Sequence, residues 1–328
     1  MVESIRWGIL STGAIARSFV KGLNEVPDAE PVAVGSRTQQ AADAFGEEFG
    51  ISRRHPSYEA LANDPDVDVI YVATPHSLHR ENSILCLRAG KPVLCEKPFA
   101  INRPEAADIV AAAREEGLFL MEAMWTRFLP IMYQVRQWLR DGQIGEVRMV
   151  SADFGFGSSP GTTKSRLYDP VLGGGALMDV GIYSLSFASM VYRRVPSRVM
   201  SMGHIGELEV DEQAGMMLGY DEGAMAMLFT SIQCGTSHWA HIMGTKGIIR
   251  IHPPYWRGST ATLVRDGKET LVERKYDGNG YNCQAEAVGR YLREGKLESE
   301  EIPLDETVDI MGTMDTIRDR IGLKFPME

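Results

Sequence analysis

Several features that would assign a chain to a specialised class of protein are missing from this sequence. The four cysteines (Cys86, Cys95, Cys234 and Cys283) are scattered and form no Cys-x-x-Cys pair, so neither a disulfide framework nor a zinc knuckle is indicated. The net charge is −10 and no Lys/Arg tract is present, which disfavours a nucleic acid or an anionic membrane as a partner. No apolar run approaches the ~18 residues that a membrane span needs. A small molecule is therefore the expected partner.

The N-terminus also lacks the marks of an exported protein. Met1-Val2-Glu3 leads directly into an apolar strand pattern without a basic region, a long apolar core or a cleavage site, which favours a cytoplasmic location. The chain is 328 residues long, and its composition, 44% apolar and 24% charged, is that of an ordinary globular protein. A prior of about 150 residues per domain suggests two domains. We place them at residues 1–124 and 125–328.

A glycine-containing turn lies between the first predicted strand and the first predicted helix. The turn reads Ser11-Thr12-Gly13-Ala14-Ile15-Ala16 and matches the dinucleotide fingerprint G-x-G-x-x-G/A at its second and third positions, with Ser11 at the first. Gly13 would let the backbone approach a pyrophosphate at the helix N-terminus, and Ala16 would let helix and strand pack closely. Strand-to-helix turns with glycine are common without any ligand, so a purely structural turn is an equal alternative at this point.

The end of the second strand indicates which dinucleotide would bind. The strand 31–35 is followed by Ser36-Arg37-Thr38, where an NAD site would place Asp or Glu against the ribose 2′-hydroxyl. The two hydroxyls and the Arg37 guanidinium would instead bind a 2′-phosphate. The predicted cofactor is therefore NADP, with NAD less favoured. Ser36 and Thr38 can also serve as caps of the helix 40–49, because a cap and a phosphate site can share one helix start.

Wholly apolar strands alternate with helices through the rest of the first domain. This pattern predicts a parallel sheet that helices cover on both faces. Ligands of such sheets bind at the carboxyl ends of the strands, so the residues that follow the strands should face one crevice. These residues are Thr74, Pro75 and His76, then Glu96 and Lys97, and finally Glu122. The convergence strengthens the dinucleotide interpretation of the turn.

A pair of histidines at the start of the next helix is the nearest approach to a metal motif. His76 and His79 are three residues apart, but no third ligand stands at a recognisable spacing. We interpret both as residues that line the crevice and predict no metal.

The second half of the chain changes from alternating elements to consecutive strands. Hairpin turns at Asp221-Glu222-Gly223 and Asp266-Gly267 predict a largely antiparallel sheet. The predicted fold class is thus α/β followed by α+β: a doubly wound parallel Rossmann sheet, then a large, mostly antiparallel open sheet flanked by helices. The predicted strands cover 147–154, 198–204, 213–220, 224–232, 237–243, 247–252, 260–264 and 269–274, and a Gly/Ser/Pro-rich loop covers 155–174.

One helical segment, 173–186, is apolar on nearly every side. Its polar exceptions form a stripe of Asp179, Tyr183 and Ser186 at i, i+4 and i+7. An unpaired buried carboxylate is costly, so Asp179 needs a partner. That partner belongs either to a catalytic site or to a structural arrangement with Tyr183, backbone or an arginine, which the glycine run at 173–175 would allow to approach.

These residues combine into a site for moving a hydride and a proton together. Oxidation of a carbinol by a nicotinamide needs an acid/base group for the hydroxyl proton. A tyrosine near a lysine suits this task, because the positive charge favours phenolate and lowers the phenol pKa from about 10. Lys97 can supply that charge, and Asp179 can orient Lys97 or the substrate.

The ordered motifs of the chain resemble those of the glucose–fructose oxidoreductase / inositol dehydrogenase / MocA family. They are 7–16 (Trp-Gly-Ile-Leu-Ser-Thr-Gly-Ala-Ile-Ala), 95–99 (Cys-Glu-Lys-Pro-Phe), 122–130 (Glu-Ala-Met-Trp-Thr-Arg-Phe-Leu-Pro), 173–183 (Gly-Gly-Gly-Ala-Leu-Met-Asp-Val-Gly-Ile-Tyr) and 244–247 (Gly-Thr-Lys-Gly). The 122–128 run and Tyr183 look most like the trans-dihydrodiol and D-xylose dehydrogenase branch. Tyr183 stands where the inositol branch has His, and Ser11 replaces the first fingerprint Gly.

The resemblance implies roles for individual residues. Lys97 and Tyr183 would be the catalytic pair with Asp179 in support, and the Lys97–Pro98 bond would often be cis. The substrate would lie among Trp125, Arg127, Phe154, Asp179, Tyr183 and Trp256. The cofactor would contact Ser11, Thr12, Gly13, Ala14, Ile15, Ser36, Arg37, Thr38, Thr74, Pro75, His76, His79, Glu96, Lys97 and Trp125.

The resemblance also implies a partner and a function. The open sheet of the second domain would pack against its twin in a homodimer. The predicted function is an NADP-dependent dehydrogenase of a cyclic polyol, either an aldose such as xylose or glucose or a trans-dihydrodiol. Two alternatives stay open: a reductase of a sugar ketone or aldehyde, and a non-catalytic NADP-binding regulator of the same fold.

Overall fold

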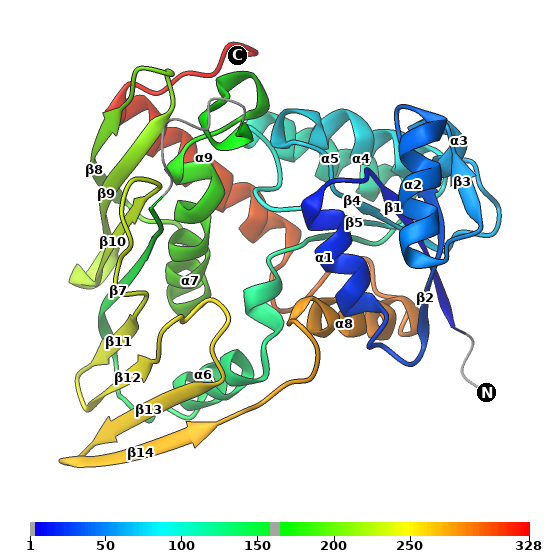
Figure 1. Cartoon of the computed structure of the whole chain (residues 1–328). Helices are drawn as coiled ribbons and strands as arrows, with labels where there is room; N and C mark the ends of the chain where they lie inside the picture. Colours follow the sequence, from blue (N-terminus) through cyan, green and yellow to red (C-terminus); the bar gives the residue numbers. More distant parts are fainter. Residues whose placement is uncertain (1–3, 158–164) are drawn as a thin grey trace. The chain divides into compact units, whose positions relative to one another are not determined.

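The computed structural model describes residues 4–157 and 165–328, so seven residues of the predicted 155–174 loop lie outside the described residues. Within the described chain, contacts define two compact units (Figure 1). The first unit comprises Met1–Trp125 and Asp277–Thr307, and the second comprises Thr126–Tyr276 and Val308–Glu328.

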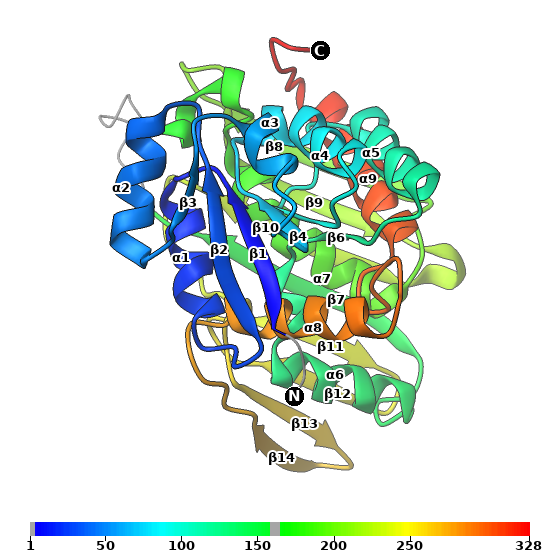
Figure 2. The same ribbon diagram turned by 90° about the vertical axis from the view of Figure 1, so that its right-hand side faces the viewer.

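The first unit is built on a six-stranded parallel sheet. The strand order is β3-β2-β1-β4-β5-β6, the doubly wound arrangement in which the order reverses beside the first strand. Figure 2 shows β1, β2 and β3 side by side with helices on both faces of the sheet. The strands are β1 (Ile5–Leu10), β2 (Ala29–Gly35), β3 (Arg53–His55), β4 (Val69–Val72), β5 (Val93–Cys95) and β6 (Leu120–Glu122).

The helices of this unit begin and end at the residues that local chemistry favours. Side chains of Thr38, Ser57 and Asn102 accept hydrogen bonds from backbone N–H groups of the helices that follow them. Gly50 and Gly117 end two helices in the left-handed conformation. The elements are α1 (Ala14–Leu23), α2 (Gln39–Phe49), α3 (Tyr58–Ala62), η1 (His76–Leu78), α4 (His79–Arg88), α5 (Arg103–Glu116) and α8 (Tyr281–Arg293).

The chain returns to the first unit late in the sequence, which a single boundary between residues 124 and 125 does not describe. Helix α8 buries Ala285, Ala287 and Val288 and packs against α1. The Asn279 side chain donates to the Ser18 carbonyl at 2.8 Å, and Arg293 pairs with Asp28 at 2.7 Å. The apolar face of α8 is thus covered by other elements of the first unit, which helical periodicity alone does not specify.

The second unit holds an eight-stranded sheet in the order β14-β13-β12-β11-β7-β10-β9-β8. Every neighbouring pair is antiparallel except β7 and β10. Both predicted hairpins are present, and Asp266 and Gly267 take the positive φ values of 52° and 72° that a tight two-residue turn needs. The strands are β7 (Val147–Gly155), β8 (Arg198–Ile205), β9 (Asp211–Gly219), β10 (Met225–Ser231), β11 (Ala240–Gly244), β12 (Gly247–Ile251), β13 (Thr260–Arg265) and β14 (Lys268–Glu273). The predicted fold class is confirmed.

One face of this sheet is covered by helix α7 (Ile182–Tyr192), which packs on β7 and β10 (Figure 1). Among the described residues, Pro170–Tyr192 is the one segment long and apolar enough to cross a membrane, but 89% of its apolar window is buried inside the protein. Burial of that degree is typical of a core helix. The other helical elements are η2 (Trp125–Phe128), α6 (Pro130–Arg140), η3 (Arg166–Tyr168), η4 (Pro170–Leu172), the π-helical turn η5 (Leu177–Gly181), η6 (Asp221–Gly223) and α9 (Leu304–Ile321).

Candidate active site

The glycine turn after β1 has the form of a dinucleotide site. Ser11 takes φ = +101°, the conformation that Gly serves at the first fingerprint position, so the serine substitution leaves the turn geometry in place. Gly13 is extended and caps α1 without a side-chain hydrogen bond, and the first turn of α1 has no acidic residue. A Cβ on Gly13 would meet only Ser11 Oγ, at 4.0 Å. The N–H groups of this helix start therefore suit an anion such as a pyrophosphate.

The three residues after β2 differ in whether they form hydrogen bonds with other residues of the protein. Ser36 is buried and its N–H donates to the His55 carbonyl at 3.2 Å. Thr38 Oγ1 accepts from Ala41 N at 3.3 Å, so its role as a helix cap is confirmed. The exposed Arg37 guanidinium forms no hydrogen bond or ion pair with any residue in 4–157 or 165–328. It is the member of the set that is available to a phosphate.

Tyr58 is a neighbour of this region that the sequence did not single out. Burial raises the pKa of its phenol, while the Arg37 charge and a hydrogen bond with Ser11 oppose that rise. The tyrosine therefore lies beside both the fingerprint turn and the predicted phosphate-binding residue. No sequence signal marks it beyond its place at the first position of α3, directly after the Ser57 cap.

The residues after β4 are held together by the imidazole of His79. His79 is fully buried, and its Nδ1 and Nε2 lie 2.9 Å from the carbonyl oxygens of Pro98 and Thr74. It thereby ties the start of α4 to the turn after β5. Pro75 precedes η1, and the ring of His76 lies 5.7 Å from that of His79, edge to face. Both ring nitrogens of His79 thus lie against backbone carbonyls, and its contact with a cofactor stays a prediction.

The Glu-Lys-Pro turn after β5 is fixed largely through its glutamate. Glu96 is buried, and it accepts a 2.5 Å hydrogen bond from the Tyr71 hydroxyl and a 3.1 Å bond from the Lys97 N–H. Burial raises the pKa of Tyr71 far above its usual value, and the Glu96 charge adds to the rise. The Lys97–Pro98 bond is cis, as the family resemblance implied. The backbone that presents Lys97 is therefore anchored in the sheet.

In the second unit, Asp179 has an arginine partner. Arg166 Nη2 lies 2.5 Å from Asp179 Oδ1, and the pair is formed because the preceding glycines permit a close approach. A Cβ on Gly174 would come within 2.6 Å of the Leu167 carbonyl oxygen. Asp179 itself lies in the π-helical turn η5, a feature that is frequent at functional sites. The structural arrangement with an arginine, which the sequence left open, is thus present.

The predicted aromatic walls of the substrate site do come together. Phe154 and Trp256 are stacked, with ring centroids 4.4 Å apart and planes 5° apart. The Tyr183 ring lies 5.3 Å from Phe154 and 6.3 Å from Trp256. All three residues are in the second unit and come from different segments of the chain, so the fold assembles a flat apolar surface beside the Tyr183 ring. Such a surface suits the face of a ring.

Two other predicted substrate residues are engaged within their own units. Arg127 is buried, and its guanidinium donates to the Oγ and the carbonyl of Ser186 at 2.9 and 2.7 Å. The third residue of the polar stripe on the Asp179 helix is therefore paired with an arginine. Trp125 is buried in the first unit, where its ring lies 4.8 Å from that of Tyr281. Among the predicted catalytic residues, Lys97 belongs to the first unit and both others to the second.

His238 is a member of the aromatic group that sequence reasoning missed. Its ring lies 5.4 Å from Phe154 and 6.1 Å from Trp256, edge to face in both cases. The residue takes φ = +59°, and Asp153 holds this conformation by accepting from His238 N at 2.7 Å and from Ser237 Oγ at 2.9 Å. Only the tertiary structure joins 153 to 238, so no local pattern could have indicated them.

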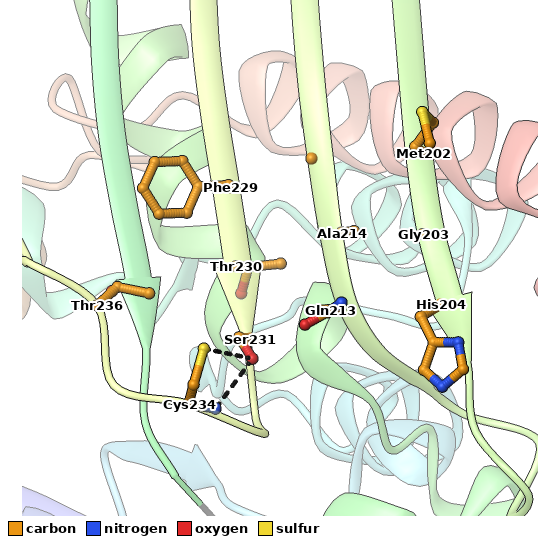
Figure 3. Close-up of a pocket in the computed structure, with 11 residues that line it drawn as sticks. Met202, Gly203, His204, Gln213, Ala214, Phe229, Thr230, Ser231, Cys234 and Thr236 are labelled. Atoms are coloured by element: carbon orange, nitrogen blue, oxygen red, sulfur yellow. Dashed lines mark hydrogen bonds between the residues drawn. The ribbon is translucent and has the colours of Figure 1, made fainter.

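Two further observations bound the site. In the part of the chain that the structure describes, no group of three or more His, Cys, Asp or Glu residues is placed to bind a metal ion. A cavity of about 500 Å³ lies on the eight-stranded sheet, and no predicted site residue lines it (Figure 3). Its walls come from β8, β9, β10 and the segment after β10, with Met202, His204, Phe229 and Cys234 among them.

A doubly wound parallel sheet with a dinucleotide turn, followed by a largely antiparallel sheet, is typical of a class of proteins: the nicotinamide-dinucleotide oxidoreductases. Family models agree, since residues 5–124 match "Oxidoreductase family, NAD-binding Rossmann fold" and residues 132–250 match "GFO/IDH/MocA C-terminal domain". The chain belongs to the GFO/IDH/MocA family of oxidoreductases and is an NAD(P)-dependent enzyme. The resemblance predicted from its motifs is confirmed.

Full-length relatives and solved structures are similar to this chain. Trans-1,2-dihydrobenzene-1,2-diol dehydrogenases of Xenopus laevis and Mus musculus are each 37% identical and cover 98% and 99% of this chain and 99% of their own. An aldose-aldose oxidoreductase from Caulobacter crescentus, complexed with glycerol, is 27% identical with a TM-score of 0.89 and covers 97% of both chains. A 3-ketoreductase from Actinomadura kijaniata, in complex with NADP and TDP-benzene, is 27% identical with a TM-score of 0.85 and covers 97% of this chain and 98% of its own.

Proposed function

We propose that the protein is an NADP-dependent dehydrogenase of a cyclic polyol, either an aldose such as D-xylose or D-glucose or a trans-dihydrodiol. The observation that carries the proposal is the stacked Phe154–Trp256 pair beside Tyr183, because it offers a ring-shaped substrate an apolar face next to an acid/base group. The similarity to dihydrodiol dehydrogenases and to an aldose oxidoreductase supports both substrate classes.

The first unit has the residues to hold the cofactor. The open Gly13 turn and the uncapped start of α1 suit the pyrophosphate, and Arg37 suits a 2′-phosphate. When bound, the nicotinamide would supply the hydride acceptor or donor. The absence of a carboxylate at 36–38 favours NADP over NAD, and NADP in the similar ketoreductase supports this choice.

The acid/base step is assigned to Lys97 and Tyr183. The tyrosine would take the hydroxyl proton during oxidation, and the lysine charge would favour its phenolate form. Asp179, held by Arg166, would orient the site. Solved variants of the similar ketoreductase have a lysine replaced by Ala and a tyrosine replaced by Phe, which supports attention to these two residue types. Arg127 would act by bracing α7 through Ser186 rather than by touching substrate.

An absorbance assay tests the function directly. The protein is offered NADP⁺ with pentoses, hexoses, inositols and trans-dihydrodiols, and each reaction is repeated with NAD⁺. We expect a rise at the NADPH absorbance band with an aldose or a dihydrodiol.

Arg37→Ala should lower the preference for NADP⁺ over NAD⁺ by about 10-fold or more, since a charge-assisted hydrogen bond is worth about 1.5–3 kcal/mol. Lys21→Ala is the matched control, because Lys21 lies in the last turn of α1, at the end of the helix away from the Gly13 turn. A wild-type preference for NAD⁺ would contradict the cofactor assignment.

The reverse direction is a second candidate, because one similar structure is a 3-ketoreductase. The same protein with NADPH and a panel of keto sugars and aldoses would then consume NADPH. The kcat values measured in the two directions, each at saturating cofactor and substrate, show in which direction the enzyme turns over faster.

We also propose that the protein forms a homodimer through the open face of the eight-stranded sheet. This face exposes Met200, Met202, Met217, Met227 and Phe229, a contiguous apolar set of the kind that marks an interface, and it includes part of the cavity in Figure 3. Sedimentation should give a dimer for the wild type and a monomer for the double variant Met202→Glu, Phe229→Glu.

A cytoplasmic location stays a prediction from the sequence.

A further inference from the structure

Asp211, the first residue of β9, is a fully buried acid that neither the sequence nor the proposed chemistry accounts for. Its Oδ2 accepts a hydrogen bond from the Leu177 N–H at 2.7 Å. Its Oδ1 is also buried and has no hydrogen-bond partner among the described residues. Burial raises the pKa of the carboxyl to about 7, and Arg318 is the charged side chain that opposes the rise. A group this costly to bury calls for a structural reason.

The Gly173–Gly175 run explains how Asp211 reaches the helix. Gly175 takes φ = +111°, a conformation that strains any other residue. A Cβ on Gly175 would collide with Asp211 Oδ1. Gly174, one residue earlier, makes room for the carbonyl groups of Arg166 and Leu167. The glycine run thus allows the turn that contains Arg166 to approach at Gly174 and the Asp211 carboxyl to approach at Gly175.

The carboxyl sits at the point where the helix with the polar stripe begins. Leu177 is the first residue of the π-helical turn η5, and its N–H is one of the donors that a helix start leaves without an intrahelical acceptor. A carboxyl at this position also faces the positive end of the helix dipole. From the neighbouring strand β10, Thr230 Oγ1 donates to the Ala176 and Phe154 carbonyls at 3.3 and 3.0 Å. Two strands therefore fix the same helix start.

We infer that Asp211 is a positioning residue for Asp179 and Tyr183: it caps the π-helical turn and thereby sets the rotation and height of the helix from which both side chains project. The inference rests on the proposed function, since it gives Tyr183 the acid/base role. Asp179 lies two residues after the capped Leu177 and Tyr183 six residues after it. Loss of the cap would let the first turn fray or rewind as an ordinary α-helix, displacing the two side chains relative to the Phe154–Trp256 pair.

The test compares two substitutions at Asp211 with one at its neighbour. Asp211→Asn keeps an oxygen for the Leu177 N–H, whereas Asp211→Val removes it. Glu212→Gln is the matched control, because Glu212 is a buried acid on the same strand that pairs with Gln233 instead of the helix. We expect the Val variant to lose about 10-fold or more in kcat with an NADP⁺ KM within about 2-fold of wild type, and the Asn variant to recover most of the loss.

Amide hydrogen exchange of the peptide 175–186 supplies a readout that does not need a substrate. Exchange should accelerate by about 10-fold in Asp211→Val and stay near wild type in Asp211→Asn and Glu212→Gln. Equal exchange in all variants would overturn the capping inference, and so would an Asn variant as impaired as the Val variant. If Asp211→Val does not fold, Asp211→Ala, which also removes the acceptor for the Leu177 N–H, takes its place beside the Asn variant and the Glu212→Gln control. Wild-type exchange in the Ala variant would overturn the inference. Failure of the whole substrate panel would count against the proposed function and leave the exchange result intact.

Discussion

The replacement of Asp211 by Asn should change how the stability of the protein depends on pH. The carboxyl pKa is raised from 3.8 to about 7 by burial, so folding favours its neutral form. The stability that the group contributes is fully present below pH 3.8 and is lost as pH rises toward 7. With 1.36 kcal/mol per pKa unit, the loss between pH 5 and pH 8 is about 2.5 kcal/mol. Asn does not ionise, so the effect of an Asn at this site on the free energy of unfolding is the same at every pH.

Urea unfolding at several pH values between 5 and 8 measures this difference. All other ionisable groups titrate alike in the two proteins, so they cancel when the free energy of unfolding of the wild type is subtracted from that of the Asn variant. The difference should increase in favour of Asn by about 2.5 kcal/mol across the range. A difference that stays constant from pH 5 to pH 8 would refute the reasoning, because the carboxyl pKa would then not be raised in the folded protein.

Three further predictions concern the two units. Ser11→Gly should raise the free energy of unfolding by about 1 kcal/mol in thermal or urea unfolding, because φ = +101° strains a serine; a loss of stability would contradict this. Asp64→Asn should lower the free energy of unfolding by about 2 kcal/mol near neutral pH, since Asp64 accepts two hydrogen bonds from Arg53 at 2.7 and 2.6 Å. Burial opposes ionisation of Asp64, but the hydrogen bonds outweigh it and hold its pKa well below its usual range, so the gap to wild type should narrow only below about pH 4. Phe154→Leu should lower kcat/KM for ring substrates by about 10-fold by removing the stack on Trp256, with NADPH binding measured by fluorescence unchanged.

The fold was largely predictable because its elements carry strong local signals. The wholly apolar run at 69–72 and the turn Asp266-Gly267 each indicate their structure without tertiary information. Strand β3 (Arg53–His55) was missed because it has no apolar residue. It is stabilised instead by the buried Asp64, which pairs with Arg53 at 2.6 Å and His55 at 2.7 Å. The return of α8 to the first unit was missed for a different reason, because the helical pattern indicates a buried face but not the element that covers it.

The candidate site was predictable where a motif carries the chemistry and not where tertiary contacts supply it. Tyr183 was singled out by its place on a polar helical stripe, and Phe154 and Trp256 were named from the family resemblance, which gave no indication that they stack. Asp211 and His238 were not found from the sequence, because each reaches the site from another strand or loop and neither belongs to a spacing pattern. The glycine run gave the one usable hint, since it indicated a close approach but not by which group.

The proposed shared role of Lys97 and Tyr183 in the acid/base step is the central claim, and measuring turnover and cofactor binding in the same two variants tests it most directly. Lys97→Met and Tyr183→Phe are each assayed for turnover with the best substrate of the panel and, separately, for NADPH binding by fluorescence titration. Loss of acid/base catalysis should lower kcat by about 100-fold or more in each variant, while the Kd for NADPH stays within about 3-fold of wild type. Turnover near the wild-type rate in either variant, or cofactor binding that falls in step with turnover in both, would contradict the account.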